Sequence, residues 1–242
     1  MNFLWILLIV VVAVEATVLP ETVTTVYGKI KGVTETLPSG NQVQFFKGIP
    51  FAKPPVGTLR FEKPQPPEPW TTTLNATSFG KQCVQFFLPP FNGATDSEDC
   101  LFINIARPTT PSIDPRGYPV MLYLFGGAFV TGSALSGHNA YANDALVTKG
   151  VILASINYRL GPLGYYSSRD LSAPGNYALW DIIQALQFIQ DVIPQFGGDK
   201  NLLAGCDQVA NKKECLKALS IEQLVNISAV SFRGGTLGGT AR

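Results

Sequence analysis

The chain has 242 residues, of which 46% are hydrophobic and 14% are charged, and its formal net charge at pH 7 is +1. That length accommodates one large domain or two small ones with a sizeable core. Because no run of Lys and Arg gives the chain a basic surface, neither nucleic acid nor an anionic membrane surface is an expected partner.

The N-terminus is typical of a secretory signal peptide. An apolar run extends from Phe3 to Val14, which is shorter than the about 20 residues that a membrane-spanning helix needs. The run ends in Val14-Glu15-Ala16, which suits signal peptidase. We predict a signal peptide over residues 1–16, cleaved after Ala16, and a secreted, extracellular protein with no membrane span once the signal is removed. An uncleaved N-terminal anchor is the alternative.

The cysteine count fits secretion. Four cysteines in an oxidising compartment indicate two disulfides, and local spacing favours Cys83 with Cys100 and Cys206 with Cys215. No C-x-x-C motif occurs and His138 is the only histidine, so no metal site is predicted.

Two Asn-x-Ser/Thr triplets, at Asn75 and Asn226, are candidate glycosylation sites. Both would fit a protein that passes through the secretory pathway.

The residues after the signal indicate short strands followed by a long loop. β-branched and polar residues alternate around Tyr27-Gly28-Lys29, which predicts a hairpin, and Val43 to Phe46 predicts a further strand. The stretch from Ile49 to Trp70 is rich in proline. A flexible linker is one interpretation of it. The large apolar residues spaced through it favour an ordered, packed loop in extended conformation.

Strands and helices alternate in the middle of the chain. Strand candidates are Leu101 to Ala106, Val120 to Phe125 and Val151 to Tyr158, and the last two resemble strands buried on both faces. Helices are expected at Asp144 to Lys149 and Asn176 to Ile193. Apolar residues recur at helical spacing in the second helix, at Leu179, Ile182, Ile183, Leu186, Ile189 and Ile193. This alternation predicts an α/β fold with flanking helices and a mixed, mostly parallel sheet.

The alternation breaks after the second helix. A crossover helix normally leads to a parallel strand, but Leu202 and Leu203 fall short of the about 5 to 6 residues of a typical strand. A short helix with a capping box restarts at Ser220, and from Asn226 the sequence is rich in glycine without periodicity. The architecture is therefore predicted to be interrupted after Asn201.

Four stretches together resemble the type B carboxylesterase and cholinesterase family of α/β-hydrolases. In chain order they are FKGIPFAKPPVGTLRFEKPQPPEPW, SEDCLFINI, PVMLYLFGGAFVTGS, and VILASINYRLGPLGYYSS with GNYALWDIIQALQFIQDVIPQFGGDKN. The resemblance implies an incomplete α/β-hydrolase fold, of which residues 17–201 are the N-terminal part. Residues 202–225 resemble the family's second disulfide loop and the helix after it, rejoined here, and residues 226–242 form a divergent tail.

The resemblance also implies a role for Gly126-Gly127-Ala128, which follows the strand candidate VMLYLF. The N–H groups of Gly127 and Ala128 would be two donors of the family's oxyanion hole, where small residues let the backbone approach the substrate. Phe125 stands where many members have histidine, although aromatic residues also occur there. Taken alone, the same residues fit a plain tight turn after a buried strand.

The family hydrolyses carboxylic esters with a serine in a G-x-S-x-G turn, a histidine and a carboxylate. No serine of this chain has that setting, and His138 lies in the loop after the glycine-rich turn. We therefore expect a truncated family member that lacks the nucleophile, the acid and the histidine and is inactive as written. Its longer relative would act on small-molecule carboxylic esters without a cofactor. The alternative is a non-enzymatic, secreted cholinesterase-like binding or adhesion protein.

Overall fold

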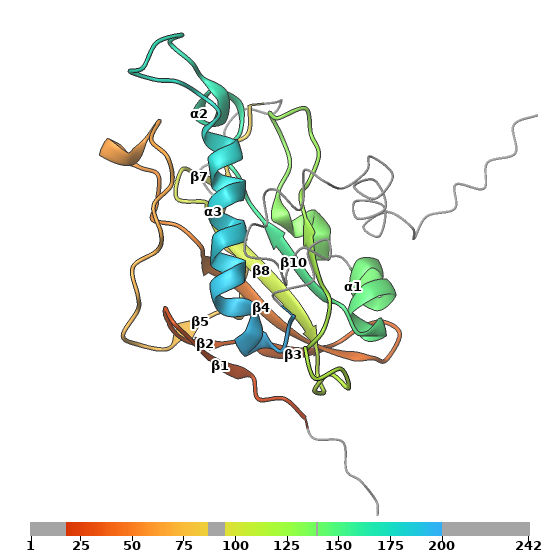
Figure 1. Cartoon of the computed structure of the whole chain (residues 1–242). Helices are drawn as coiled ribbons and strands as arrows, with labels where there is room; N and C mark the ends of the chain where they lie inside the picture. The colour runs from red at the N-terminus through yellow and green to blue at the C-terminus, as the bar shows by residue number, and fades with distance from the viewer. Residues whose placement is uncertain (1–17, 87–94, 139, 200–242) are drawn as a thin grey trace, which may run out of the picture.

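The computed structural model describes residues 18–86, 95–138 and 140–199 (Figure 1). Within these ranges the strands are β1 Thr22–Thr25, β2 Gly28–Lys31, β3 Val33–Thr36, β4 Gln42–Pro50, β5 Leu74–Asn75, β6 Gln82–Cys83, β7 Asp96–Ser97, β8 Phe102–Pro108, β9 Val120–Tyr123 and β10 Ile152–Ile156. The α-helices are α1 Ala140–Leu146, α2 Gly161–Tyr165 and α3 Tyr177–Val192, and 3-10 turns cover Gly57–Leu59, Ala134–His138, Val147–Lys149 and Ile193–Phe196.

Several predictions fall outside the described residues. They are the signal peptide over residues 1–16, the rejoined segment 202–225, the tail 226–242, the pair Cys206 and Cys215, and Asn226. The predicted hairpin is present as β1 and β2, and the strand predicted at Val43 to Phe46 is the middle of the longer β4.

The main sheet has five strands in the order β3-β4-β8-β10-β9. It is mixed, as expected for the α/β class, but the expected parallel majority is wrong for the described strands. Within this sheet only β9 and β10 pair in parallel, whereas β3–β4, β4–β8 and β8–β10 are antiparallel. Parallel neighbours need a crossover of a dozen or more residues, and the crossover that contains α1 links β9 directly to β10.

Helical segments cover both faces of this sheet (Figure 1). Successive residues of a strand point to opposite faces, so Phe46 packs in the cluster under α3 while its neighbour Phe45 packs in the cluster under α1. The same alternation places Ala154 with α3 and Leu153 with α1. The fold is therefore layered, with the sheet between helices.

The two strands predicted to be buried on both faces differ. All five residues of β10 are buried, because β8 and β9 flank this strand and the two clusters cover its faces. β9 is only partly buried, and Tyr123 is exposed, because β9 is the last strand of the described sheet. The chain returns to this edge after α3, where Tyr118 and Gly198 form a parallel bridge and the Asp199 N–H donates to the Tyr118 carbonyl at 2.8 Å.

α3 forms where its spacing predicted, but only part of the predicted apolar set faces the core: Ile189 is buried and Ile182 is half-buried. Leu179, Ile183 and Leu186, which belong to the predicted apolar set, are 47%, 41% and 39% exposed. The buried residues of α3 are Tyr177, Ala178, Asp181, Gln184, Ala185, Phe188, Ile189 and Val192. Two polar side chains lie on this face because each has a partner: Asp181 pairs with Arg159, and the Gln184 amide donates to the Phe51 carbonyl.

The proline-rich stretch after β4 is an ordered, packed loop, as predicted. Phe51 is fully buried, and the Lys53 N–H donates to the Gln65 carbonyl at 2.9 Å. The Trp70 indole donates to the Lys29 carbonyl at 2.8 Å and thereby fixes the end of the loop on the hairpin.

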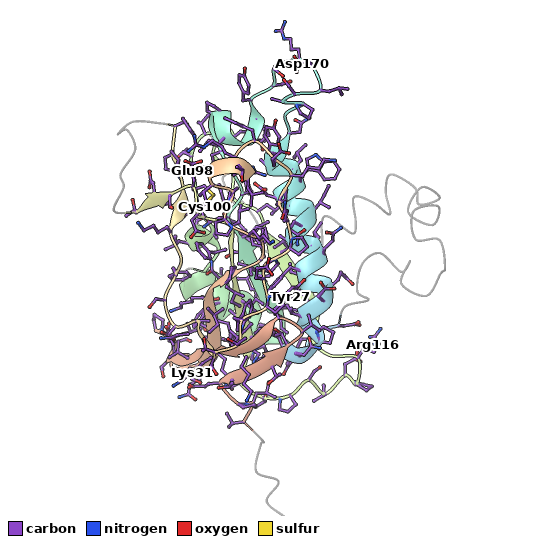
Figure 2. All side chains as sticks on the ribbon, turned by 90° about the vertical axis from the view of Figure 1, so that its left-hand side faces the viewer. Tyr27, Lys31, Glu98, Cys100, Arg116 and Asp170 are labelled. Carbon is purple, nitrogen blue, oxygen red and sulfur yellow. A yellow bond between two sulfur atoms is a disulfide. The ribbon has the colours of Figure 1, made fainter. Side chains whose placement is uncertain are left out.

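The hairpin is fixed on α3 through Tyr27, whose side chain lies beside the helix in Figure 2. Its ring stacks on Phe188 with centroids 5.1 Å apart, and its hydroxyl donates to Asp191 at 3.0 Å. Burial, together with Asp191, raises the pKa of Tyr27 to about 12, so this phenol remains a donor at neutral pH.

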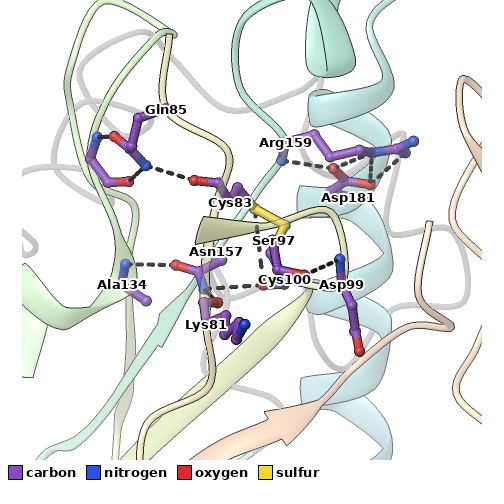
Figure 3. The surroundings of a disulfide bond; sticks show 11 residues. Lys81, Cys83, Gln85, Ser97, Asp99, Cys100, Ala134, Asn157, Arg159 and Asp181 are labelled. Carbon is purple, nitrogen blue, oxygen red and sulfur yellow. Dashed lines mark hydrogen bonds and ion pairs between the residues drawn. A yellow bond between two sulfur atoms is a disulfide. The ribbon is translucent and has the colours of Figure 1, made fainter. Parts of the chain in front are cut away.

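A buried ion pair joins the end of β10 to α3 (Figure 3). Asp181 accepts from the backbone N–H of Arg159 at 3.0 Å and from its Nε and Nη2 at 2.9 and 2.7 Å. The two side chains are 0% and 4% exposed. Burial raises the pKa of Asp181 and the hydrogen bonds from Arg159 oppose that shift, so the carboxylate relies on Arg159 to stay ionised.

We predict that Asp181→Asn strongly destabilises the fold, because the Arg159 guanidinium would be left buried without its counter-charge. Removing one partner of a buried pair costs about 3–5 kcal/mol of unfolding free energy. Glu98→Gln is the matched control, since Glu98 pairs with Arg60 across partly exposed side chains and should cost far less. Denaturant unfolding measures both, and equal losses would contradict the assignment.

Candidate functional site

The candidate site is the turn after β9, residues 125–132, which we call the β9 turn. It begins beyond the carboxyl end of β9 and bends through an unusual backbone. Gly127 and Gly132 have φ of 143° and 117°, and the non-glycine residues Ala128 and Phe129 have φ of 52° and 64°. Non-glycine residues seldom adopt positive φ without support from their surroundings, and such residues cluster at functional sites.

Glycine is required at one position of the predicted trio and not at its neighbour. A Cβ on Gly127 would lie 2.0 Å from the Thr131 carbonyl oxygen, whereas a Cβ on Gly126 would meet nothing within 4 Å. The close approach at Gly127 arises because its own carbonyl accepts from the Val130 and Thr131 N–H groups at 3.0 and 3.1 Å. Gly127 is therefore the tightest point of the β9 turn.

Neighbouring elements hold the outer carbonyls of the β9 turn. The Phe129 carbonyl accepts from the Gly161 N–H, at the start of α2, at 2.7 Å. The Val130 carbonyl accepts from the Phe86 N–H at 2.8 Å. The turn is thus fixed on two sides by backbone that comes from distant parts of the chain.

Phe125, which stands where the family often has histidine, anchors the first end of the β9 turn. Its buried ring stacks on Tyr158, with centroids 4.3 Å apart and planes 10° apart. The Tyr158 hydroxyl donates to the Phe125 carbonyl. Burial raises the pKa of Tyr158, with a smaller contribution from Tyr123, so the hydroxyl keeps the proton that it donates.

None of the four N–H groups from Gly126 to Phe129 has an acceptor among the described residues, and the middle two are the donors predicted from the sequence. Among the described residues, no acceptor is bonded to the backbone N–H of Gly127 or of Ala128. Gly127 is half-buried and Ala128 is exposed. Two adjacent N–H groups without internal acceptors, in a turn that is held from outside, can receive an anionic or polarised oxygen.

The disulfide predicted between Cys83 and Cys100 is present (Figure 3). The buried Asn157 side chain bonds to the backbone near both cysteines, because Asn157 Nδ2 donates to the carbonyls of Lys81 and Cys100 at 3.0 Å each. The Asn157 Oδ1 accepts from the Ala134 N–H at 2.9 Å, just beyond the β9 turn. Asn157 therefore ties the disulfide to the segment that leaves the turn.

Other predicted residues lie away from the β9 turn. Asn75 is exposed at the end of β5. His138 ends the 3-10 turn Ala134–His138. Within residues 18–86, 95–138 and 140–199, no group of His, Cys, Asp and Glu could hold a metal ion, and no helix is both long and apolar enough to cross a membrane.

Sequence reasoning missed the residues that support the turn. Asn157, Tyr158 and Arg159 follow β10 directly, and each has a buried polar partner in a different part of the fold. The available signal was three hydrogen-bonding side chains placed immediately after a strand that is apolar except for Ser155.

Comparison with known proteins shows which family the chain resembles. A carboxylesterase family model matches residues 20–210. Juvenile hormone esterase of Tribolium castaneum is 42% identical over 180 residues, and para-nitrobenzyl esterase of Bacillus subtilis is 42% identical over 186 residues. The alignments cover 73% and 74% of this chain but only 30% and 36% of those relatives. The chain thus spans about a third of the length of these two proteins.

A solved structure of a PNB esterase superposes with a TM-score of 0.61 at 42% identity. It covers 74% of this chain, and this chain covers 36% of it. The expected α/β-hydrolase class is confirmed by this likeness.

We predict that Gly127→Ala disrupts the β9 turn while Gly126→Ala does not. Alanine at position 127 combines a φ of 143° with a 2.0 Å approach to the Thr131 carbonyl, so the turn must shift. A strained non-glycine backbone alone costs about 1–3 kcal/mol, whereas a side chain in open space changes stability by less than about 0.5 kcal/mol. Denaturant unfolding of the two variants gives the comparison, and equal stabilities would contradict the geometry.

Proposed function

The chain belongs to the carboxylesterase family, and we propose that its β9 turn supplies the oxyanion-stabilising donors of a carboxylic-ester hydrolase site. The observation that carries the proposal is the pair of N–H groups at Gly127 and Ala128, which have no acceptor among the described residues. The surrounding contacts add support, because they fix the backbone of the turn without using these two donors.

The proposed chemistry follows from where charge develops in ester hydrolysis. When a nucleophile adds to the ester carbonyl, the carbonyl oxygen becomes negative in the tetrahedral intermediate. Donors that already point at that oxygen stabilise it without reorganisation, and one such donor contributes about 10²–10³ in rate. The N–H groups of Gly127 and Ala128 would act in this way on small-molecule carboxylic esters, with no cofactor required.

We further propose that the 242-residue chain does not hydrolyse esters by itself. Its sequence contains no G-x-S-x-G serine, and its one histidine, His138, lies beyond the β9 turn at the end of the 3-10 turn Ala134–His138. The oxyanion donors alone have no nucleophile to work with. In this proposal residues 17–201 are the N-terminal part of the esterase domain, residues 202–225 a rejoined later part, and residues 226–242 a divergent tail.

The prediction for activity is that the purified chain neither hydrolyses p-nitrophenyl acetate above the buffer rate nor reacts with a fluorophosphonate probe. Para-nitrobenzyl esterase of Bacillus subtilis is the positive control, and a heat-denatured sample of the chain gives the background labelling. Labelling of the native chain that disappears on denaturation would contradict the proposal, because it would reveal an activated nucleophile.

We also propose that the chain is secreted after cleavage behind Ala16 and is glycosylated at Asn75. The exposed position of Asn75 supports the second point. Expression in a eukaryotic cell should release a product that begins at Thr17 and loses mass on treatment with peptide N-glycosidase, whereas Asn75→Gln should remove the glycan at that site. Retention of the chain in the cell with residues 1–16 intact would contradict the prediction of secretion.

A further inference from the structure

We propose that Gln85 is the positioning residue for the far end of the β9 turn. Its side-chain amide clamps Gly132 to the disulfide loop that Cys83 and Cys100 close. The inference rests on the proposed function of the turn and adds how its geometry is maintained.

The central observation is a reciprocal pair of hydrogen bonds to one residue. The Gly132 N–H donates to Gln85 Oε1 at 2.7 Å, and Gln85 Nε2 donates to the Gly132 carbonyl at 3.0 Å. An amide side chain thus meets both polar backbone groups of Gly132, and Figure 3 shows Gln85 beside the disulfide. A side chain that is only a donor or only an acceptor cannot reproduce this pairing.

The amide is itself held in place by the disulfide loop. Gln85 Nε2 also donates to the Cys83 carbonyl at 2.8 Å, within its own segment. The next residue contributes a backbone contact, because the Phe86 N–H donates to the Val130 carbonyl. Gln85 and Phe86, which come two and three residues after Cys83, therefore both form hydrogen bonds to the β9 turn.

Position 132 is where such a clamp matters. Gly132 has a φ of 117°, and a Cβ there would lie 2.3 Å from the Phe125 ring. Tyr158 holds the Phe125 carbonyl at the first end of the turn, and Gln85 holds Gly132 at the other. With both ends fixed by side chains, the middle can keep the N–H groups of Gly127 and Ala128 free of internal acceptors.

Hydrogen–deuterium exchange of the full chain tests the clamp. Gln85→Leu removes the three side-chain bonds and should speed exchange in peptides that cover residues 126–133 by about tenfold, while peptides from β10 and α3 keep their rates. Gln82→Leu is the matched control, because Gln82 immediately precedes Cys83 and its side chain donates to Asp96 at 2.7 Å, away from the turn.

Gln85→Glu adds a readout that general destabilisation would not produce. A protonated carboxyl can both donate to the Gly132 carbonyl and accept from its N–H, whereas a carboxylate can only accept. The neutral form is therefore favoured in the fold, which raises the pKa above the ordinary value of about 4.3. Protection of the turn should be present below that ordinary pKa and be lost as pH rises through the higher, folded-state pKa.

The proposal would be overturned by equal exchange of the turn in Gln85→Leu and Gln82→Leu, by a wild-type turn without protection, or by protection in Gln85→Glu that does not change with pH. An increase spread evenly over β10 and α3 would also overturn it, since the residue would then stabilise the fold generally. None of these results depends on ester hydrolysis, so the clamp and the proposed function can fail separately.

Discussion

The structure depends on the polar contacts of three consecutive residues at the end of β10. Asn157 binds both ends of the disulfide loop, Tyr158 holds the Phe125 carbonyl, and Arg159 pairs with Asp181 on α3. A fully buried strand delivers these side chains into the interior, where unpaired polar groups are costly. Each side chain therefore needs its partner in place, and the partners belong to the β9 turn, the disulfide loop and α3. One strand end thereby sets the relative positions of three separate parts of the chain.

This arrangement explains how a turn with a strained backbone can stay in shape. Positive φ at Ala128 and Phe129 is unfavourable, but the carbonyls at positions 125, 129 and 130 each accept a hydrogen bond from outside the turn. These contacts fall on carbonyls, and the N–H groups at Gly127 and Ala128 have no acceptor among the described residues. A preorganised donor pair of this kind is what an oxyanion requires, because the donors need not reorient as charge develops. The constraint on the fold and the proposed chemistry thus use different backbone groups of the same turn.

Much of the architecture follows from local sequence patterns. Strands β4, β8, β9 and β10, the hairpin, α3 and the pairing of Cys83 with Cys100 were predictable, since each depends on periodicity or spacing within a short stretch. The buried face of α3 was not, because Asp181 becomes acceptable inside only through Arg159, which is 22 residues away. The antiparallel share of the sheet was missed for a related reason, as strand direction depends on connections that apolar runs do not reveal. At the β9 turn, the glycines in the sequence predicted the position of the turn. The side chains that hold it, Tyr158 and Gln85, were not predicted because they are distant in sequence.

The central claim is that partners outside the β9 turn hold it at Phe125, Phe129, Val130 and Gly132, while the N–H groups of Gly127 and Ala128 have no internal acceptor. Two-dimensional NMR of the uniformly ¹⁵N-labelled chain tests this directly through the temperature dependence of each amide proton shift. The account predicts steep, solvent-like dependence for the Gly127 and Ala128 amides and shallow dependence for those of Val130, Thr131 and Gly132, which have internal acceptors. Shallow dependence at Gly127 and Ala128 would mean that both donors are already occupied, and it would contradict the oxyanion assignment.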